Sequence, residues 1–265
     1  MTGNNNLDGA EPGIRESVIT LPTVRAAGVP LVAVPGSEVL EQLRSVAERL
    51  DGGGIPVHFV NAYTVSLTTE PRYLRLFQSG GVNIADGTPL AWIARLMSGQ
   101  VAHLRGPDAF REILSSKPAY RLRHFLLGGN EESLARLEAA IARNHPDAVV
   151  VGAFSPPFTE FGDSDRNHID SLIRECAANV VWVGIGTPKQ DYEVVRLAAL
   201  HPAVVLAVGA AFNFVSGDVV EAPSLWRRTG LEWMYRLLRE PRRLWRRYLL
   251  GNLTFLVLAV RRRRG

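Results

Sequence analysis

The chain has 265 residues, of which 46% are hydrophobic and 21% charged, a composition typical of a globular protein that excludes a disordered or fibrous one. Its one cysteine, Cys176, excludes an internal disulfide. The net charge is +4, but residues 227–265 hold 12 arginines against two glutamates, a balance of +10 that leaves −6 for the rest. A basic segment on an acidic body indicates an anionic partner: nucleic acid, an anionic membrane or a phosphate-bearing substrate.

Residues 1–25 are expected to form a flexible leader. They begin with the polar stretch MTGNNNLDGAEPG, which lacks the apolar run of a secretion signal. Chain ends of this kind are poorly ordered unless something ties them down. The folded body is therefore expected to begin at residue 26.

Residues 26–225 alternate short apolar runs with longer amphipathic stretches of helical spacing. This alternation predicts a single α/β catalytic domain, in which a Rossmann-like and mostly parallel sheet is flanked by helices. The apolar runs, each expected to form a strand, are 29–34, 55–62, 82–86, 123–129, 148–154, 180–186 and 203–211.

Residues 226–265 are expected to form a C-terminal helical basic appendage, because arginines there are interleaved with tryptophan and tyrosine. The apolar stretch at 249–260 has twelve residues, fewer than the roughly 20 that span a bilayer. The arginines suit an interfacial helix that meets lipid phosphates, and they also suit a clamp on a substrate diphosphate. The alternative without a function is a solvated basic surface.

Polar residues follow several of the predicted strands, where ligands of open parallel sheets bind. Asp86 ends the run VNIAD and suits either a helix N-cap, the more common role of such a residue, or a general base that takes a proton from a hydroxyl. Asn61 could hold a sugar hydroxyl or a diphosphate, or only satisfy a turn.

Two glycine-containing turns follow other strands. GIGTPKQ at 184–190 and the Gly128-Gly129 pair in FLLGGN match neither the P-loop nor the dinucleotide fingerprint. Each suits a phosphate cradle as well as a plain tight turn. No histidine pair has metal-ligand spacing, and the letters DSD at 163–165 suit a helix start, so no metal is expected.

Taken in order, these segments resemble the WecG/TagA/CpsF family of bacterial glycosyltransferases over about residues 27–255. The motifs that carry the resemblance are VNA, VNIADGTPLAW, RGPDAF, HFLLGGN, HPDAVVVGAFSPPF, VGIGTPKQD, VGAAFNFVSG and GLEWMYRLLREPRRLWRR. The ordered set is specific, and GTPKQ and GLEWMYRLLREP are its most distinctive parts.

The resemblance implies an inverting, metal-independent reaction without a cofactor. A sugar, N-acetylmannosamine or a related hexose, would pass from a UDP-sugar to a polyprenyl-diphosphate-linked sugar acceptor in cell-surface polysaccharide or teichoic acid synthesis. The protein would lie in the cytoplasm, bound peripherally to the anionic inner face of the cell membrane. Nucleic acid is not an expected partner, and homo-oligomerisation is left open.

The resemblance also assigns roles to residues. Asp86 becomes the general base, and the C-terminal appendage closes over the site. The residues expected to bind substrate are Asn61, Thr88, Arg105, Gly128, Gly129, Gln190, Asn213, Arg236, Arg243 and Arg246.

Three positions depart from the usual family pattern. Phe59 stands where many members have threonine, Asn213 stands where an aspartate is usual, and Glu221 replaces the arginine of a common RAP motif. The amide of Asn213 can still accept a hydrogen bond from a uracil N–H. These departures bear on the identity of the donor more than on the type of reaction.

Two other functions are weighed against this one. A Rossmann-like dehydrogenase or methyltransferase would lack its GxGxxG motif here and leaves the basic segment unexplained. A membrane-peripheral adaptor that binds anionic lipid has no use for Asp86 and Gln190 in one crevice.

Overall fold

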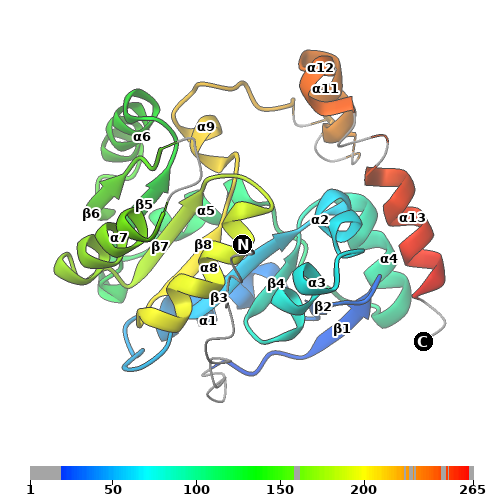
Figure 1. Cartoon of the computed structure of the whole chain (residues 1–265), viewed down its shortest axis with the longest axis horizontal. Helices are drawn as coiled ribbons and strands as arrows, with labels where there is room; N and C mark the ends of the chain where they lie inside the picture. Colours follow the sequence, from blue (N-terminus) through cyan, green and yellow to red (C-terminus); the bar gives the residue numbers. More distant parts are fainter. Residues whose placement is uncertain are drawn as a thin grey trace, which may run out of the picture.

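The structure is a computed structural model and describes residues 19–157, 162–223, 225–226, 229, 231–245, 249 and 251–262, without the side chains of residues 97, 98 and 243. Six parallel strands form the central sheet in the order β4-β3-β8-β7-β5-β6 (Figure 1). The predicted α/β fold with a mostly parallel sheet is confirmed. The strands are β3 (Ile55–Val60), β4 (Val82–Ala85), β5 (Arg123–Gly128), β6 (Val149–Phe154), β7 (Val180–Gly184) and β8 (Val204–Ala207).

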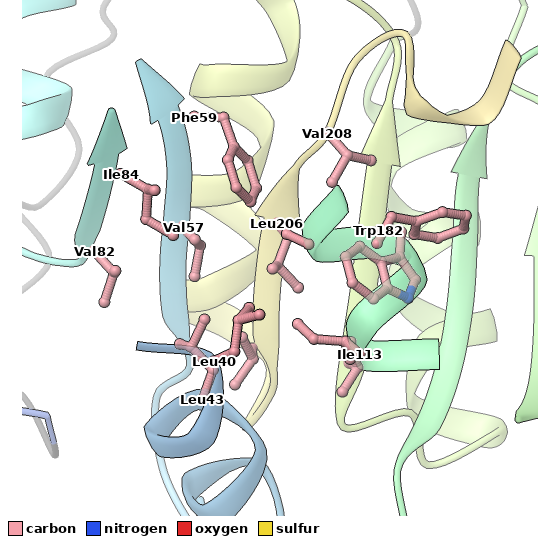
Figure 2. Packing of buried hydrophobic residues seen from close by; sticks show 14 of the residues in the cluster. Leu40, Leu43, Val57, Phe59, Val82, Ile84, Ile113, Trp182, Leu206 and Val208 are labelled. Atoms are coloured by element: carbon pink, nitrogen blue, oxygen red, sulfur yellow. The ribbon is translucent and has the colours of Figure 1, made fainter. Parts of the chain in front are cut away.

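Helices cover both faces of this sheet. On β7, Val180 and Trp182 pack into a core shared with α1, α5 and α6, while Val181 and Val183 pack against α7 and α8. Both faces are therefore apolar, and the strands appear in the sequence as continuous apolar runs. Figure 2 shows the first core, where Trp182 lies near Ile113 and Leu206. The helices before the appendage are α1 (Gly36–Ala47), α2 (Ala62–Leu67), α3 (Pro71–Gln78), α4 (Thr88–Ser98), α5 (Gly106–Leu114), α6 (Glu131–Asn144), α7 (Asp163–Glu175), α8 (Lys189–Leu200) and α9 (Ala211–Val215), with a 3₁₀ turn at Pro118–Tyr120.

The first apolar run forms a hairpin instead of a strand of the parallel sheet. β2 (Val29–Val32) pairs antiparallel with β1 (Thr23–Ala26) in a separate two-stranded sheet. Ala27 and Gly28 join them with φ of 52° and 85°, the two positive values that a tight hairpin turn requires. The ordered body therefore begins inside the expected leader, of which residues 1–18 lie outside the described residues.

The C-terminal segment is helical, as expected, with α11 (Glu232–Arg239), α12 (Pro241–Trp245) and α13 (Gly251–Arg261). α13 packs against α2 at the β4 end of the sheet (Figure 1) and buries Phe255, Leu258 and Ala259. No helix in the described part of the chain is long and apolar enough to cross a membrane. The appendage is thus attached to the body through α13.

Candidate active site

A cavity of about 150 Å³ lies beyond the carboxyl ends of β3 and β4, between the body and the appendage. The body contributes backbone and side chains that follow two adjacent strands, and α11 and α13 supply the rest. The side chains that line the cavity include Asn61, Tyr63, Asp86, Thr88, His103 and Arg105 from the body, and Glu232, Trp233, Arg236 and Asn252 from the appendage.

Asn61 follows β3 and is the N-cap of α2. Its Oδ1 accepts hydrogen bonds from the backbone N–H groups of Tyr63 and Thr64, both at 3.1 Å. The Asn61 side chain is also hydrogen-bonded to Asp86. Because Oδ1 faces the helix and a carboxylate only accepts, the amide nitrogen is the group that donates to Asp86. One residue thus caps a helix and orients the carboxylate.

Asp86 follows β4, and its backbone N–H donates to the carbonyl of Val60 at 2.7 Å. α4 begins only at Thr88, with Gly87 at φ 100° as its N-cap and no side-chain capping bond. The interpretation of Asp86 as a helix cap is therefore wrong. Its side chain instead lines the cavity, as does Thr88.

Burial, and after it the negative charge of Glu232, raise the pKa of the Asp86 carboxyl above its ordinary value, and the net pKa is about 7. The charges of Arg105 and Arg236 and the hydrogen bond from Asn61 act in the opposite direction and lower this pKa. A pKa near neutrality suits a general base, because the carboxylate is ionised at working pH yet basic enough to take a proton.

Arg105 lines the cavity but is already engaged by carboxylates. Its Nη2 lies 2.9 Å from Oε1 of Glu232 and 3.6 Å from Oε1 of Glu221, and its Nη1 lies 3.2 Å from both oxygens of Asp108. Glu221 also pairs with Arg111 at 3.1 Å. The glutamate that departs from the family pattern therefore joins an ion-pair cluster between the body and the segment leading to the appendage.

Arg236 differs from Arg105, since no ion pair of its guanidinium is seen among the described residues. Its Nε is buried without a hydrogen-bond partner there, and its guanidinium carbon lies 5.5 Å from the centre of the Phe214 ring. A buried N–H without a partner carries a desolvation cost that an anionic ligand would relieve. Arg236 is therefore the cation in the cavity best placed to receive a phosphate.

Four predicted substrate-binding residues do not line this cavity, namely Gly128, Gly129, Gln190 and Asn213. Gln190 is buried, and its amide is used internally: Oε1 accepts from the Gly186 N–H at 3.1 Å and Nε2 donates to the Ala207 carbonyl at 3.2 Å. A Cβ on Gly128 would lie 2.6 Å from the Gly184 carbonyl, so this glycine permits close strand packing. Their contact with substrate stays a prediction.

Two predicted arginines cannot be placed. Arg243 belongs to α12, but its side chain is not described, and Arg246 lies outside the described residues. Their role as diphosphate ligands also stays a prediction.

Eight of the residues that line the cavity were not predicted from the sequence. Burial and the positive charges of Arg95 and Arg105 lower the pKa of His103, whose backbone bridges Ala85 at the sheet edge, and no motif marks it. Glu232 differs from His103, because a glutamate inside a strongly basic segment is unusual and could have indicated a site residue. The lining residues that were not predicted are Ala62, Tyr63, Gly87, Pro89, His103, Glu232, Trp233 and Asn252.

A parallel α/β sheet with a buried carboxyl and two arginines in a cavity at its strand ends is typical of an enzyme that moves a group to or from an anionic substrate. The sequence model of the glycosyl transferase WecG/TagA/CpsF family matches residues 24–265, and the chain belongs to that family. It is therefore a glycosyltransferase of cell-surface polysaccharide synthesis. The alternatives of a dehydrogenase, a methyltransferase and a non-catalytic adaptor are set aside.

No group of histidine, cysteine, aspartate or glutamate side chains in the described residues could hold a metal ion. Metal independence and the lack of a cofactor stay predictions.

Proposed function

We propose that this glycosyltransferase moves N-acetylmannosamine or a related hexose from a UDP-sugar to a polyprenyl-diphosphate-linked sugar, with inversion and without a metal. The observation that carries the proposal is Asp86, a carboxyl of pKa about 7 in a cavity that also holds Arg236, whose buried Nε has no hydrogen-bond partner among the described residues. A base for a hydroxyl and a cation for a diphosphate are the two groups that such a transfer requires.

In the proposed reaction, the acceptor hydroxyl attacks the anomeric carbon of the donor from the face opposite UDP. The new oxygen–carbon bond forms as the bond from carbon to the UDP oxygen breaks, and the hydroxyl proton passes to Asp86. The hydrogen bond from Asn61 holds the carboxylate toward the cavity. An inverting transfer needs only this one carboxylate as a base.

The leaving diphosphate gains negative charge as the bond to the sugar breaks. Without a metal, that charge is met by fixed cations and N–H groups, which are most effective in an enclosed site. Arg236 supplies one such cation from α11, and the guanidinium can hold two phosphate oxygens at once. The donor site is therefore complete only when the appendage is docked.

A lipid-linked acceptor lies in a membrane, and α13 has a surface suited to one. Its residues Leu253, Leu256, Val257 and Val260 are exposed, while Phe255 and Leu258 on the same helix are buried against the body. An exposed apolar stripe next to arginines is typical of a helix that lies in the membrane interface. We propose peripheral binding at the cytoplasmic face of the cell membrane.

The direct test is a panel of UDP-sugars offered with a short-chain lipid diphosphate-GlcNAc acceptor, with the product linkage read by NMR. We expect one donor to be used efficiently in the presence of a metal chelator, and the product to have the inverted anomeric configuration. Retention of configuration, or dependence on an added divalent metal, would contradict the proposed mechanism. The absence of transfer from every UDP-sugar would contradict the proposed donor class.

A further inference from the structure

Glu232 belongs to the basic appendage and lines the cavity between the appendage and the body. It is the first residue of α11, and its Oε1 lies 2.9 Å from Nη2 of Arg105. Both side chains are largely enclosed, with exposed fractions of 23% and 14%. An ion pair this enclosed is weakly screened by solvent, so its charges act on their neighbours.

The charges around Asp86 come from every element that borders the cavity. Arg105 and Arg236 are cations, Glu232 is an anion, and Asp108 and Glu221 stand behind Arg105. Asn61 donates a hydrogen bond to Asp86, and His103 and Tyr63 also line the cavity. Two cations in one small cavity would by themselves favour a strongly acidic and weakly basic aspartate.

Glu232 changes that balance because it carries a negative charge that acts on Asp86 and it binds Nη2 of Arg105. The guanidinium of Arg105 donates its hydrogen bonds to Glu232 and Asp108, and acts on Asp86 through its charge alone. The Asp86 carboxylate is therefore not tied up in an ion-pair hydrogen bond with Arg105. It can accept a proton without first breaking such a bond.

Building on the proposed transfer reaction, we propose that Glu232 is a positioning residue, which holds Arg105 away from Asp86 so that the carboxylate can act as the base. The same α11 carries Arg236, so one docking event delivers the phosphate cation and the group that frees the base. In this arrangement the appendage lines the cavity beside Asp86 and helps to exclude water from it. Hydrolysis of the donor by an open site would thereby be limited.

A merely structural role for Glu232 gives a different expectation. An acid in the first turn of a helix stabilises that helix through its dipole, and an ion pair to Arg105 helps to attach the appendage. Loss of either would lower the melting temperature without altering the protonation of Asp86. The two roles are therefore separated by measuring Asp86 itself.

The measurement is the titration of the Asp86 carboxyl by NMR of protein labelled with ¹³C at the aspartate carboxyl carbons, with the signal assigned from Asp86→Asn. We expect a midpoint near pH 7 in the unaltered protein. In Glu232→Gln, which keeps the shape of the side chain, we expect it about one unit lower, the smaller end of the shift that a neighbouring charge produces. In Glu232→Asp, which keeps the negative charge, we expect a midpoint between those of Glu232→Gln and the unaltered protein.

Glu221→Gln is the matched control, because Glu221 also pairs with Arg105 but does not line the cavity. We expect the Asp86 midpoint to stay unchanged in this variant. An unchanged midpoint in Glu232→Gln, or an equal shift in Glu221→Gln, would overturn the proposal. A lower melting temperature as the sole effect of Glu232→Gln would assign it the structural role.

The rate of transfer supplies a second readout. The acidic limb of the pH–rate profile should move to lower pH in Glu232→Gln by the same amount as the NMR midpoint, and a limb that stays in place would contradict the proposal. If the unaltered protein transfers no sugar from any donor, the proposed function fails. The NMR titration still decides the claim about Glu232, so the two failures are distinguishable.

Discussion

The carboxyl of Asp86 lies among groups that act on its pKa in opposite directions. Burial and Glu232 raise the pKa, two arginines and Asn61 lower it, and the result is about 7. Ionised Asp86 is therefore less favourable in the folded protein than in the unfolded chain. At pH values below the ordinary aspartate pKa, the raised pKa of Asp86 contributes to the stability of the folded protein. That contribution is lost as the pH rises through 7. Such a cost at a strand end is typical of a functional residue.

Arg236 provides the first prediction at this scale. In Arg236→Ala, we expect the turnover number to fall by about 100-fold or more, because one preorganised group that stabilises developing charge contributes on that order. Arg239→Ala is the control on the same helix, since Arg239 is exposed and lies over Tyr235. Equal turnover in the two variants would contradict the role of Arg236 in stabilising the leaving diphosphate.

Which residues lie in the cavity was predicted from the sequence with uneven success. The resemblance placed Asp86, Asn61, Thr88, Arg105 and Arg236 in the site, and the structure brings all five into one cavity. Residue pattern alone favoured the cap for Asp86, because it does not show that Gly87, at positive φ, would take that place. Glu232 was overlooked because its importance comes from a partner 127 positions away.

At the scale of elements, α13 is fixed at both ends. At its start, a Cβ on Gly251 would lie 3.3 Å from the Tyr63 ring, so a glycine permits this close approach. At its end, Arg262 donates to the Ala27 carbonyl, the Thr68 hydroxyl and the Thr68 carbonyl at 2.8–3.0 Å. A residue from the basic C-terminal run thus serves as a structural anchor.

Arg262→Ala should loosen this helix. Loss of three charge-assisted hydrogen bonds is expected to lower the stability of the docked helix by about 2 kcal/mol, after allowance for compensation by water. The measurement is the rate of proteolytic cleavage between residues 249 and 262, together with the melting temperature. Arg261→Ala is the control, because Arg261 is the exposed neighbour, and an identical cleavage rate in both variants would refute the anchor.

Elements were predicted well where burial determines the pattern. Five strands of the parallel sheet are almost entirely buried, and the edge strand β6 is half-buried, so each appears as an apolar run. The run at 29–34 has the same composition and yet forms a hairpin, because pairing partners are chosen by long-range contacts and by the turn at Ala27-Gly28. The turn at 184–190 shows the same limit, since only the structure reveals that the Gln190 amide is used internally.

For the whole molecule, the uneven charge has a structural counterpart. The acidic body supplies Asp86, the basic appendage supplies Arg236, and the cavity lies between them. The exposed apolar residues of the appendage, Trp245, Leu253 and Leu256 among them, lie outside this cavity. The basic appendage thus lines the site with some of its residues and presents a surface suited to lipid with others.

The double variant Leu253→Ser/Leu256→Ser tests the membrane surface. We expect its binding to anionic vesicles to weaken by about tenfold or more, since burying one leucine contributes on the order of 1.5–3 kcal/mol. Transfer to a water-soluble acceptor analogue should be unaffected. Leu200→Ser is the control, because Leu200 is equally exposed but lies on α8, and unchanged vesicle binding by the double variant would contradict membrane docking through α13.

The central claim is that Asp86 is the base of a glycosyl transfer, and the most direct test is the turnover of Asp86→Asn with the preferred UDP-sugar and lipid-linked acceptor. We predict a loss of at least about 100-fold, the contribution of a positioned general base. Binding of UDP should be retained, and at pH 8 the variant should melt no lower than the unaltered protein, because a costly buried charge is removed. The unaltered enzyme should lose activity as the pH falls below about 7. Turnover of Asp86→Asn close to that of the unaltered enzyme would contradict the account.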